Sequence, residues 1–134
     1  MLRPAVPTDL ARLLAIRETS GADALSDPAL VNGGELPGLI ADGAVRVWDE
    51  AGAPVGFAAV DGAIIHLLVA SAARGKGIGR ALLADACNRI KEAGHAAATV
   101  SLAAGSTAAP HYRAAGWIEA GGSAVGGLVL KKPL

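Results

Sequence analysis

The sequence lacks the features of several large protein classes. It has one cysteine, so no disulfide can form within the chain, and this fits a reducing cytoplasm. No apolar run approaches the roughly 20 residues that a membrane-spanning helix needs, and the first residues contain no apolar signal core. Twelve basic and twelve acidic residues give a formal net charge of zero. The overall charge therefore favours neither nucleic acid nor an anionic membrane surface.

What the chain does have is enough apolar sequence for a single compact core. Its 134 residues are 52% hydrophobic and 18% charged, and they contain no repeat, low-complexity tail or linker. A length of this order is typical of one domain. We therefore expect a single domain spanning residues 1–134.

The most informative stretch runs from Ile64 to Ile90. An apolar run at residues 64–69, interrupted only by His66, has the length and composition of a buried strand. A short turn and a glycine-rich loop follow. A helical period then places one set of apolar residues on a single face: Ile78, Leu82, Ala86, Ile90 and Ala93. The order is strand, glycine loop, helix.

The loop itself has the chemistry of an anion site. Three glycines in five residues (75, 77 and 79) let backbone N–H groups approach a ligand closely, and the start of a helix leaves such groups unpaired. Two well-known phosphate loops do not fit. The P-loop needs Ser or Thr after its lysine, where this chain has Gly77. The dinucleotide fingerprint needs glycine where this chain has Arg80, which disfavours a nucleotide-binding domain.

The pattern Arg74-x-x-Gly77-x-Gly79 after an apolar strand resembles the coenzyme A (CoA) loop of the GNAT superfamily of N-acetyltransferases. The resemblance implies that loop amides bind the pyrophosphate of acetyl-CoA and that the preceding strand holds its pantetheine arm and thioester carbonyl. Carried over to this chain, the cosubstrate-binding positions are Leu67, Leu68, Val69, Arg74, Gly75, Lys76, Gly77, Ile78, Gly79 and Arg80.

The expected order of elements extends this resemblance to nearly the whole chain. Strands are expected at residues 1–6, 44–49, 55–60, 64–69, 97–102, 117–120 and 128–131, and helices after Thr8, after Asp27-Pro28 and at 35–41, 78–93 and 107–115. Asp61-Gly62 predicts a two-residue hairpin turn. The resulting α/β fold is GNAT-like: a mixed, mostly antiparallel sheet of about seven strands, one parallel βαβ pair, and helices on both faces.

A second motif near the C-terminus points to a catalytic residue. Ala108, Tyr112, Gly116 and Trp117 occupy the places of the family's Asn-Ala-Tyr-Gly-Phe pattern, although Gly105 or Ser106 stands where the Asn would be. The resemblance makes Tyr112 the candidate general acid for the leaving thiolate. A phenol has a proton to donate, and this is the only tyrosine of the chain.

The general base is not determined by the sequence. The central strand has no carboxylate, so His66, His111 or an ordered water could accept the proton of the amine. Strand alternation places His66 with Leu68, opposite Ile65, Leu67 and Val69, but a bulge, which the family leads us to expect, would re-aim these side chains. The three histidines show no metal-ligand spacing.

We therefore expect a cytoplasmic acetyl-CoA-dependent N-acetyltransferase that acts by direct attack in a ternary complex. The acceptor is a small-molecule or peptide primary amine, with no nucleic-acid or membrane partner, and the protein is a monomer or homodimer. A cluster of acidic residues in the segment that often lines the family's acceptor pocket would favour a cationic amine: Glu18, Asp23, Asp27 and Glu35. The alternative is a non-catalytic acyl-CoA-binding or interaction module on the same fold.

Overall fold

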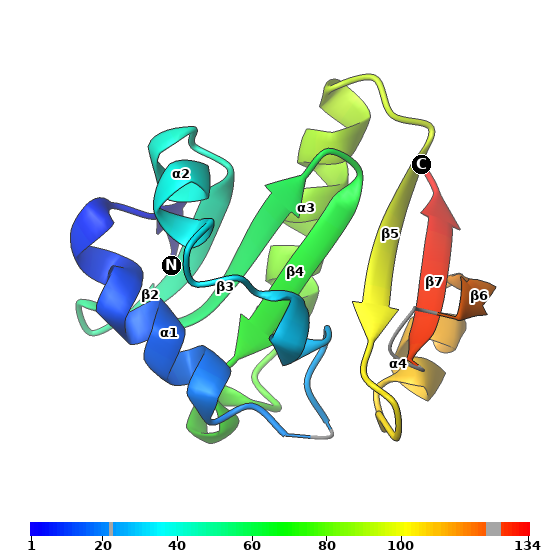
Figure 1. Ribbon diagram of the computed structural model, residues 1–134, viewed down its shortest axis with the longest axis horizontal. Helices are drawn as coiled ribbons and strands as arrows, with labels where there is room; N and C mark the ends of the chain where they lie inside the picture. The colour runs from blue at the N-terminus through cyan, green and yellow to red at the C-terminus, as the bar shows by residue number, and fades with distance from the viewer. Residues whose placement is uncertain (22, 123–126) are drawn as a thin grey trace.

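A twisted seven-stranded sheet forms the centre of the computed structural model, which describes residues 1–21, 23–122 and 127–134 (Figure 1). The strands lie in the order β1-β2-β3-β4-β5-β7-β6. They are β1 (Leu2–Pro4), β2 (Val45–Glu50), β3 (Ala53–Asp61), β4 (Ile64–Val69), β5 (Ala97–Leu102), β6 (Ile118–Gly122) and β7 (Leu128–Pro133). The α-helices are α1 (Leu10–Glu18), α2 (Leu36–Ala41), α3 (Ile78–Glu92) and α4 (Ala109–Ala114). Short 3₁₀ turns are η1 (Pro7–Asp9), η2 (Pro28–Leu30) and η3 (Ser71–Ala73).

The sheet is antiparallel except where β4 meets β5. These two strands are joined by α3 and run parallel, as a βαβ unit requires. They pair only at Ile64–Thr99 and Ile65–Val100. Beyond Ile65 the strands draw apart, and the segment that follows α1 lies between them (Figure 1). The centre of the sheet therefore has a gap between β4 and β5 beyond Ile65.

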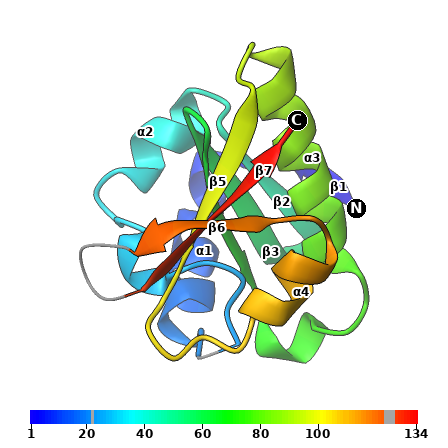
Figure 2. The ribbon, with the colours of Figure 1, turned by 90° about the vertical axis from the view of Figure 1, so that its right-hand side faces the viewer.

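Helices cover both faces of the sheet, and each face has its own core. α1 and α2 lie on one side, and α3 and α4 lie on the other (Figure 2). Alternation along β4 decides which residue enters which core. Ile65, Leu67 and Val69 pack on the α3 side, whereas Leu68 packs on the α1/α2 side. Within the described part of the chain, no helix is long and apolar enough to cross a bilayer.

The central helix α3 follows directly from its sequence period. Ile78, Leu82, Ala86 and Ile90 are buried in the core on the α3 side, one turn apart. Left-handed residues begin and end the helix: Gly77 (φ +79°) precedes it and Gly94 (φ +93°) follows it. Ala93, which was expected on the buried stripe, is instead exposed, because the helix ends at Glu92 and residue 93 is its C-cap.

Several local expectations were wrong for identifiable reasons. The β3–β4 turn consists of Gly62 and Ala63, because Asp61 still pairs with Ile64. The expected bulge in β4 is not found: the β3–β4 register runs without a shift from Gly56–Val69 to Asp61–Ile64. The helix expected at 107–115 is shorter at both ends: it runs from Ala109 to Ala114, with Ala108 and Ala115 as its caps. Of the Gly-rich link expected between residues 120 and 128, Gly121 and Gly122 belong to β6, and residues 123–126 lie outside the described residues.

The side chain that caps the first helical segment is that of Asp9, the last residue of η1, rather than that of Thr8. One Asp9 carboxylate oxygen accepts the Val6 N–H at 2.8 Å, and Arg3 donates to both carboxylate oxygens at 2.8 and 3.0 Å. Asp9 is only 7% exposed. The hydrogen bonds from Arg3 are the main reason why the pKa of Asp9 lies below its ordinary value of 3.8. This partly buried ion pair ties β1 to the turn that starts α1.

We expect Asp9→Asn to lower the free energy of unfolding by about 2 kcal/mol at pH 7, because it removes charge-assisted hydrogen bonds. A carboxyl whose pKa is lowered by folding stabilises the protein above its unfolded pKa, and this stabilisation is lost as pH falls through its folded value. The difference from wild type should therefore shrink below about pH 4. Urea unfolding at several pH values measures this, with exposed Asp42→Asn as control. A difference that does not change with pH would contradict the assignment.

Candidate active site

A cavity of about 610 Å³ opens on the α3 and α4 side of the sheet, where β4 and β5 diverge. Its wall combines the residues after β4, the first turn of α3 and the helix α4. The residues that line it are Asp23, Leu25, Leu67, Val69, Ala73, Arg74, Gly75, Gly77, Ile78, Gly79, Arg80, Leu83, His111, Tyr112, Ala114 and Ala115. Segments from four parts of the chain thus meet around one hollow.

The glycine loop has the geometry of an anion cradle. Gly75 and Gly77 have φ values of +78° and +79°, in the left-handed region that favours glycine. A Cβ atom built on either residue would meet no other atom within 4 Å, so the space beside this backbone is open. The loop leads directly into α3, whose first N–H groups lack intrahelical partners and carry the positive end of the helix dipole. These features fit a bound pyrophosphate.

Basic side chains of the loop are held differently from one another. Arg74 donates from Nε to the Val69 carbonyl oxygen at 3.2 Å and forms an ion pair with Asp23. The hydrogen bond from Arg74 is the main reason why the pKa of Asp23 is lowered. Lys76 lies 3.6 Å from the carboxylate of Glu50, and both side chains are largely exposed. Arg80 is exposed at the cavity wall, where its charge is available to a ligand.

Residues of the loop that follows α1 bridge the gap between β4 and β5. Ser26 Oγ accepts the backbone N–H of Leu67 at 2.8 Å and donates to the carbonyl oxygen of the same residue at 3.1 Å. On the other side, the N–H of Asp27 donates to the Ser101 carbonyl oxygen in β5 at 2.7 Å. Ser26 and Asp27 are buried. This dipeptide therefore takes the hydrogen-bonding positions that β4 and β5 no longer offer each other.

Tyr112 projects from α4 and lines the cavity. Its side chain is buried, at 3% exposure for the residue, and its ring meets that of Trp117 edge to face with centroids 5.3 Å apart. Its hydroxyl donates to the carbonyl oxygen of Leu25. Burial raises the pKa of Tyr112 above its ordinary value, so the phenol keeps its proton at neutral pH. The group is a hydrogen-bond donor.

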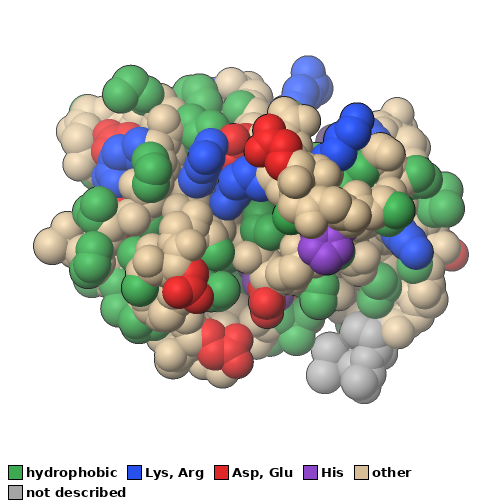
Figure 3. All heavy atoms as spheres, turned by 90° about the horizontal axis from the view of Figure 1, so that it is seen from above, with side chains coloured by type: hydrophobic (Ala, Val, Ile, Leu, Met, Phe, Trp, Pro, Cys, Tyr) green, Lys and Arg blue, Asp and Glu red, His purple; other side chains and the backbone are tan. Residues whose placement is uncertain are grey.

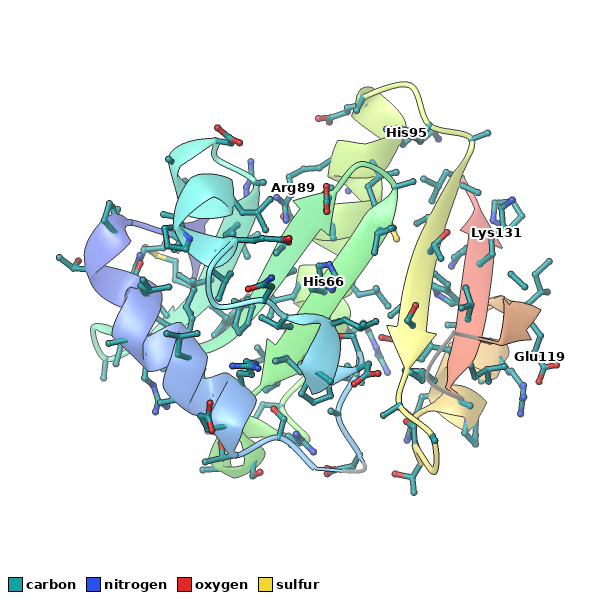
Figure 4. The ribbon with its side chains drawn as sticks, in the orientation of Figure 1. His66, Arg89, His95, Glu119 and Lys131 are labelled. Atoms are coloured by element: carbon teal, nitrogen blue, oxygen red, sulfur yellow. The ribbon has the colours of Figure 1, made fainter. Side chains whose placement is uncertain are left out.

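His66 lies on the opposite face of β4 from the cavity. Figure 4 shows its ring on the α1/α2 side of the sheet, and it is not among the residues that line the cavity. The ring is half-buried, and this burial lowers the pKa of His66 despite the nearby carboxylates of Asp61 and Glu35. Its neutral form therefore predominates at pH 7. His111 is exposed and lines the cavity from α4.

Charged side chains differ between the two faces at one end of the sheet. Figure 3 views the end that carries the β3–β4 turn: basic side chains lie mainly on the α3 side, whereas acidic side chains occur on both sides. The carboxylates that act on His66 belong to the α1/α2 side. The negative charge of these carboxylates therefore favours the approach of a cation on this face.

The structure brings most of the predicted site residues to one cavity. They are Leu67, Val69, Arg74, Gly75, Gly77, Ile78, Gly79, Arg80 and Tyr112. It does not bring Leu68, Lys76 or His66 to the cavity lining: Leu68 enters the other core, and Lys76 faces Glu50. Sequence reasoning missed Leu25 and Ser26, because no local pattern marks a loop residue that will pack against a distant strand. The functional roles of all these residues stay predictions.

Comparisons with known proteins agree with the resemblance seen in the sequence. A family profile described as "Acetyltransferase (GNAT) domain" matches residues 38–126, more than half of the chain. Among solved structures, the chain is similar to a ribosomal-protein-alanine N-acetyltransferase from Brucella melitensis. The sequence identity is 29%, the TM-score is 0.76, and the alignment covers 100% of this chain and 99% of that chain. No curated protein sequence matched the chain.

Two more distant structures share the fold. One is a GNAT superfamily phosphinothricin acetyltransferase from Sinorhizobium meliloti in complex with acetyl-CoA, with 24% identity, a TM-score of 0.76, and coverage of 100% of this chain and 88% of that chain. The other is the PaiA N-acetyltransferase from Thermoplasma acidophilum in complex with CoA, with 12% identity, a TM-score of 0.77, and coverage of 100% and 98%. The predicted fold and family are confirmed, and the chain belongs to the GNAT family of acetyltransferases.

Proposed function

We propose that this protein transfers the acetyl group of acetyl-CoA to a primary amine by direct attack in a ternary complex. The observation that carries the proposal is the cavity itself, in which the left-handed glycine loop, the start of α3 and Tyr112 meet where β4 and β5 diverge. The similar structures from S. meliloti and T. acidophilum hold acetyl-CoA and CoA, respectively, which supports acetyl-CoA as the cosubstrate.

Each part of the site has a chemical role in this proposal. Loop amides and Arg80 hold the pyrophosphate. The Leu67 N–H, which donates to Ser26 Oγ in the free protein, polarises the thioester carbonyl once the cosubstrate takes the place of that oxygen. Acetyl-CoA supplies the thioester, whose C–S bond breaks as the N–C bond to the amine forms. Tyr112 holds a proton at its hydroxyl and donates it toward the departing sulfur.

The acceptor amine enters from the α1/α2 side, because the cavity for the cosubstrate lies on the other face. The carboxylates of Glu35 and Asp61 favour a cationic amine there. The name of the B. melitensis relative, a ribosomal-protein-alanine N-acetyltransferase, makes the α-amine of a peptide one acceptor class to test, beside small-molecule amines.

The deciding experiment measures free thiol released from acetyl-CoA in the presence of an amine panel that includes peptides beginning with alanine. An enzyme should release thiol only when an acceptor is present, with one acetylated product per thiol by mass spectrometry. Saturable CoA binding without amine-dependent thiol release would instead support a non-catalytic acyl-CoA-binding module. Absence of CoA binding would overturn both assignments.

We further propose His66 as the base that accepts the amine's proton. His66→Gln should lower kcat/KM at pH 7 by about 100-fold. Because the pKa of His66 is lowered, the wild-type rate should rise with pH through a value below 6.5 and then level off. This rise should be absent in His66→Gln. A pH–rate series measures both effects.

His111→Gln, measured in the same pH series, identifies the alternatives. A large loss in His111→Gln with normal activity in His66→Gln would move the role to His111. If both variants keep the wild-type rate and pH profile, the proton leaves through water.

A further inference from the structure

Residues 23–27, here called the strap, run through the gap where β4 and β5 separate (Figure 4). Ser26 makes two hydrogen bonds to Leu67, one to its N–H and one to its carbonyl oxygen. Asp27 donates its N–H to the Ser101 carbonyl oxygen in β5. The strap is thus bonded to both strands. It closes the β4–β5 seam beyond Ile65, where the two strands do not pair.

The same strap also holds the other groups of the cavity wall. Asp23 forms an ion pair with Arg74 of the glycine loop, and the Leu25 carbonyl oxygen accepts the Tyr112 hydroxyl. The Leu25 side chain packs directly on the backbone of Gly79, where a Cβ atom on residue 79 would collide with Leu25 Cδ1. Because Gly79 has no side chain, the strap can approach its backbone closely.

Each of these contacts corresponds to a contact that one group of an acyl-CoA would make in the proposed site. A carboxylate faces the arginine where a phosphate would, and an apolar chain lies on the glycine where a pantetheine arm would. The Leu25 carbonyl oxygen accepts the hydrogen bond of the Tyr112 hydroxyl. Ser26 Oγ accepts the hydrogen bond of the Leu67 N–H, which would otherwise polarise a thioester. The two occupants need the same donors. One backbone N–H and one hydroxyl proton cannot serve both fully.

We propose that, in the free protein, the strap occupies the part of the acyl-CoA site beside Leu67, Gly79 and Tyr112, and that cosubstrate binding requires its release. The inference rests on the proposed function and adds a self-inhibitory contact to it. Release also opens the β4–β5 gap between the cavity and the α1/α2 side, so the acceptor path forms only once cosubstrate is bound. Apparent affinity is then reduced by the fraction of molecules whose strap is open.

Hydrogen exchange of the free and CoA-saturated protein tests the release directly. A peptide that contains residues 23–27 should exchange about tenfold faster when CoA is bound, because the Asp27 N–H loses its partner in β5. Peptides from the glycine loop should become more protected in the same sample. Equal or greater protection of the strap on saturation with CoA would overturn the proposal.

Variants that weaken the strap give a second readout by calorimetric titration with CoA. Ser26→Ala removes both bonds to Leu67, and Leu25→Ala removes the packing on Gly79. Each should lower the Kd for CoA about fivefold, because the closed state is less favoured. The matched control is Ser20→Ala, whose hydroxyl bonds to Ile16 in α1, outside the strap. Its Kd should equal that of wild type.

The outcomes separate the two proposals. If wild type binds CoA and both strap variants, folded as judged by thermal melting, bind it equally or more weakly, the strap is not a competitor and only this inference fails. If neither wild type nor Leu25→Ala binds CoA, the proposed function fails.

Discussion

Gly77→Glu should abolish measurable CoA binding while leaving the fold intact. The new carboxylate stands beside the loop amides and the start of α3, where the pyrophosphate is proposed to lie, and two anions repel each other there. A Cβ atom at this position meets no other atom within 4 Å, so the substitution creates no steric clash with the core. We expect a loss of affinity of about 100-fold or more, equivalent to about 2.7 kcal/mol.

The control for this variant is Gly94→Glu at the other end of α3. Gly94 has a similar left-handed φ of +93°, and a Cβ atom there also meets nothing within 4 Å. Both variants should therefore lose similar stability, about 1–2 kcal/mol, from placing a side chain in the left-handed region. Calorimetric titration should show normal CoA affinity for Gly94→Glu alone. Equal affinity in both variants would remove the loop from the binding site.

Tyr112→Phe should lower kcat by about 100-fold without weakening CoA binding. The variant keeps the ring that packs against Trp117 and removes only the hydroxyl. The departing sulfur then loses its proton donor, whereas the loop that holds the pyrophosphate is unchanged. Burial raises the pKa of this phenol, so the wild-type hydroxyl stays protonated, and its contribution should not titrate between pH 6 and 9.

Separate measurements of kcat and CoA affinity distinguish this role from a structural one. The hydroxyl also bonds to Leu25, so its loss should lower the free energy of unfolding by about 1 kcal/mol. A structural role alone would give this destabilisation with an unchanged kcat. A kcat within twofold of wild type would remove Tyr112 from the mechanism.

The local elements of the fold could be predicted because their causes lie within a few residues. The apolar run at 64–69 is β4, and the period of residues 78–90 buries one face of α3. Glycines at 77 and 94 mark the ends of that helix because both adopt a left-handed backbone. The order of these elements then restricts the topology, since a strand–helix–strand unit within one sheet is parallel and right-handed. The parallel pairing of β4 with β5 and the position of the glycine loop follow from this, whereas the rest of the sheet was expected from the resemblance to the family.

The sequence by itself therefore determined the fold, the glycine loop and the family. Only the tertiary structure decided which partners the buried polar groups have. Ser26 bonds to a residue 41 positions away, and Tyr112 bonds to one 87 positions away. No local pattern predicts such pairs, because they depend on how far β4 and β5 diverge and on which loop fills the gap. The same holds for His66, whose half-buried place on the α1/α2 side follows from the unbroken β3–β4 register.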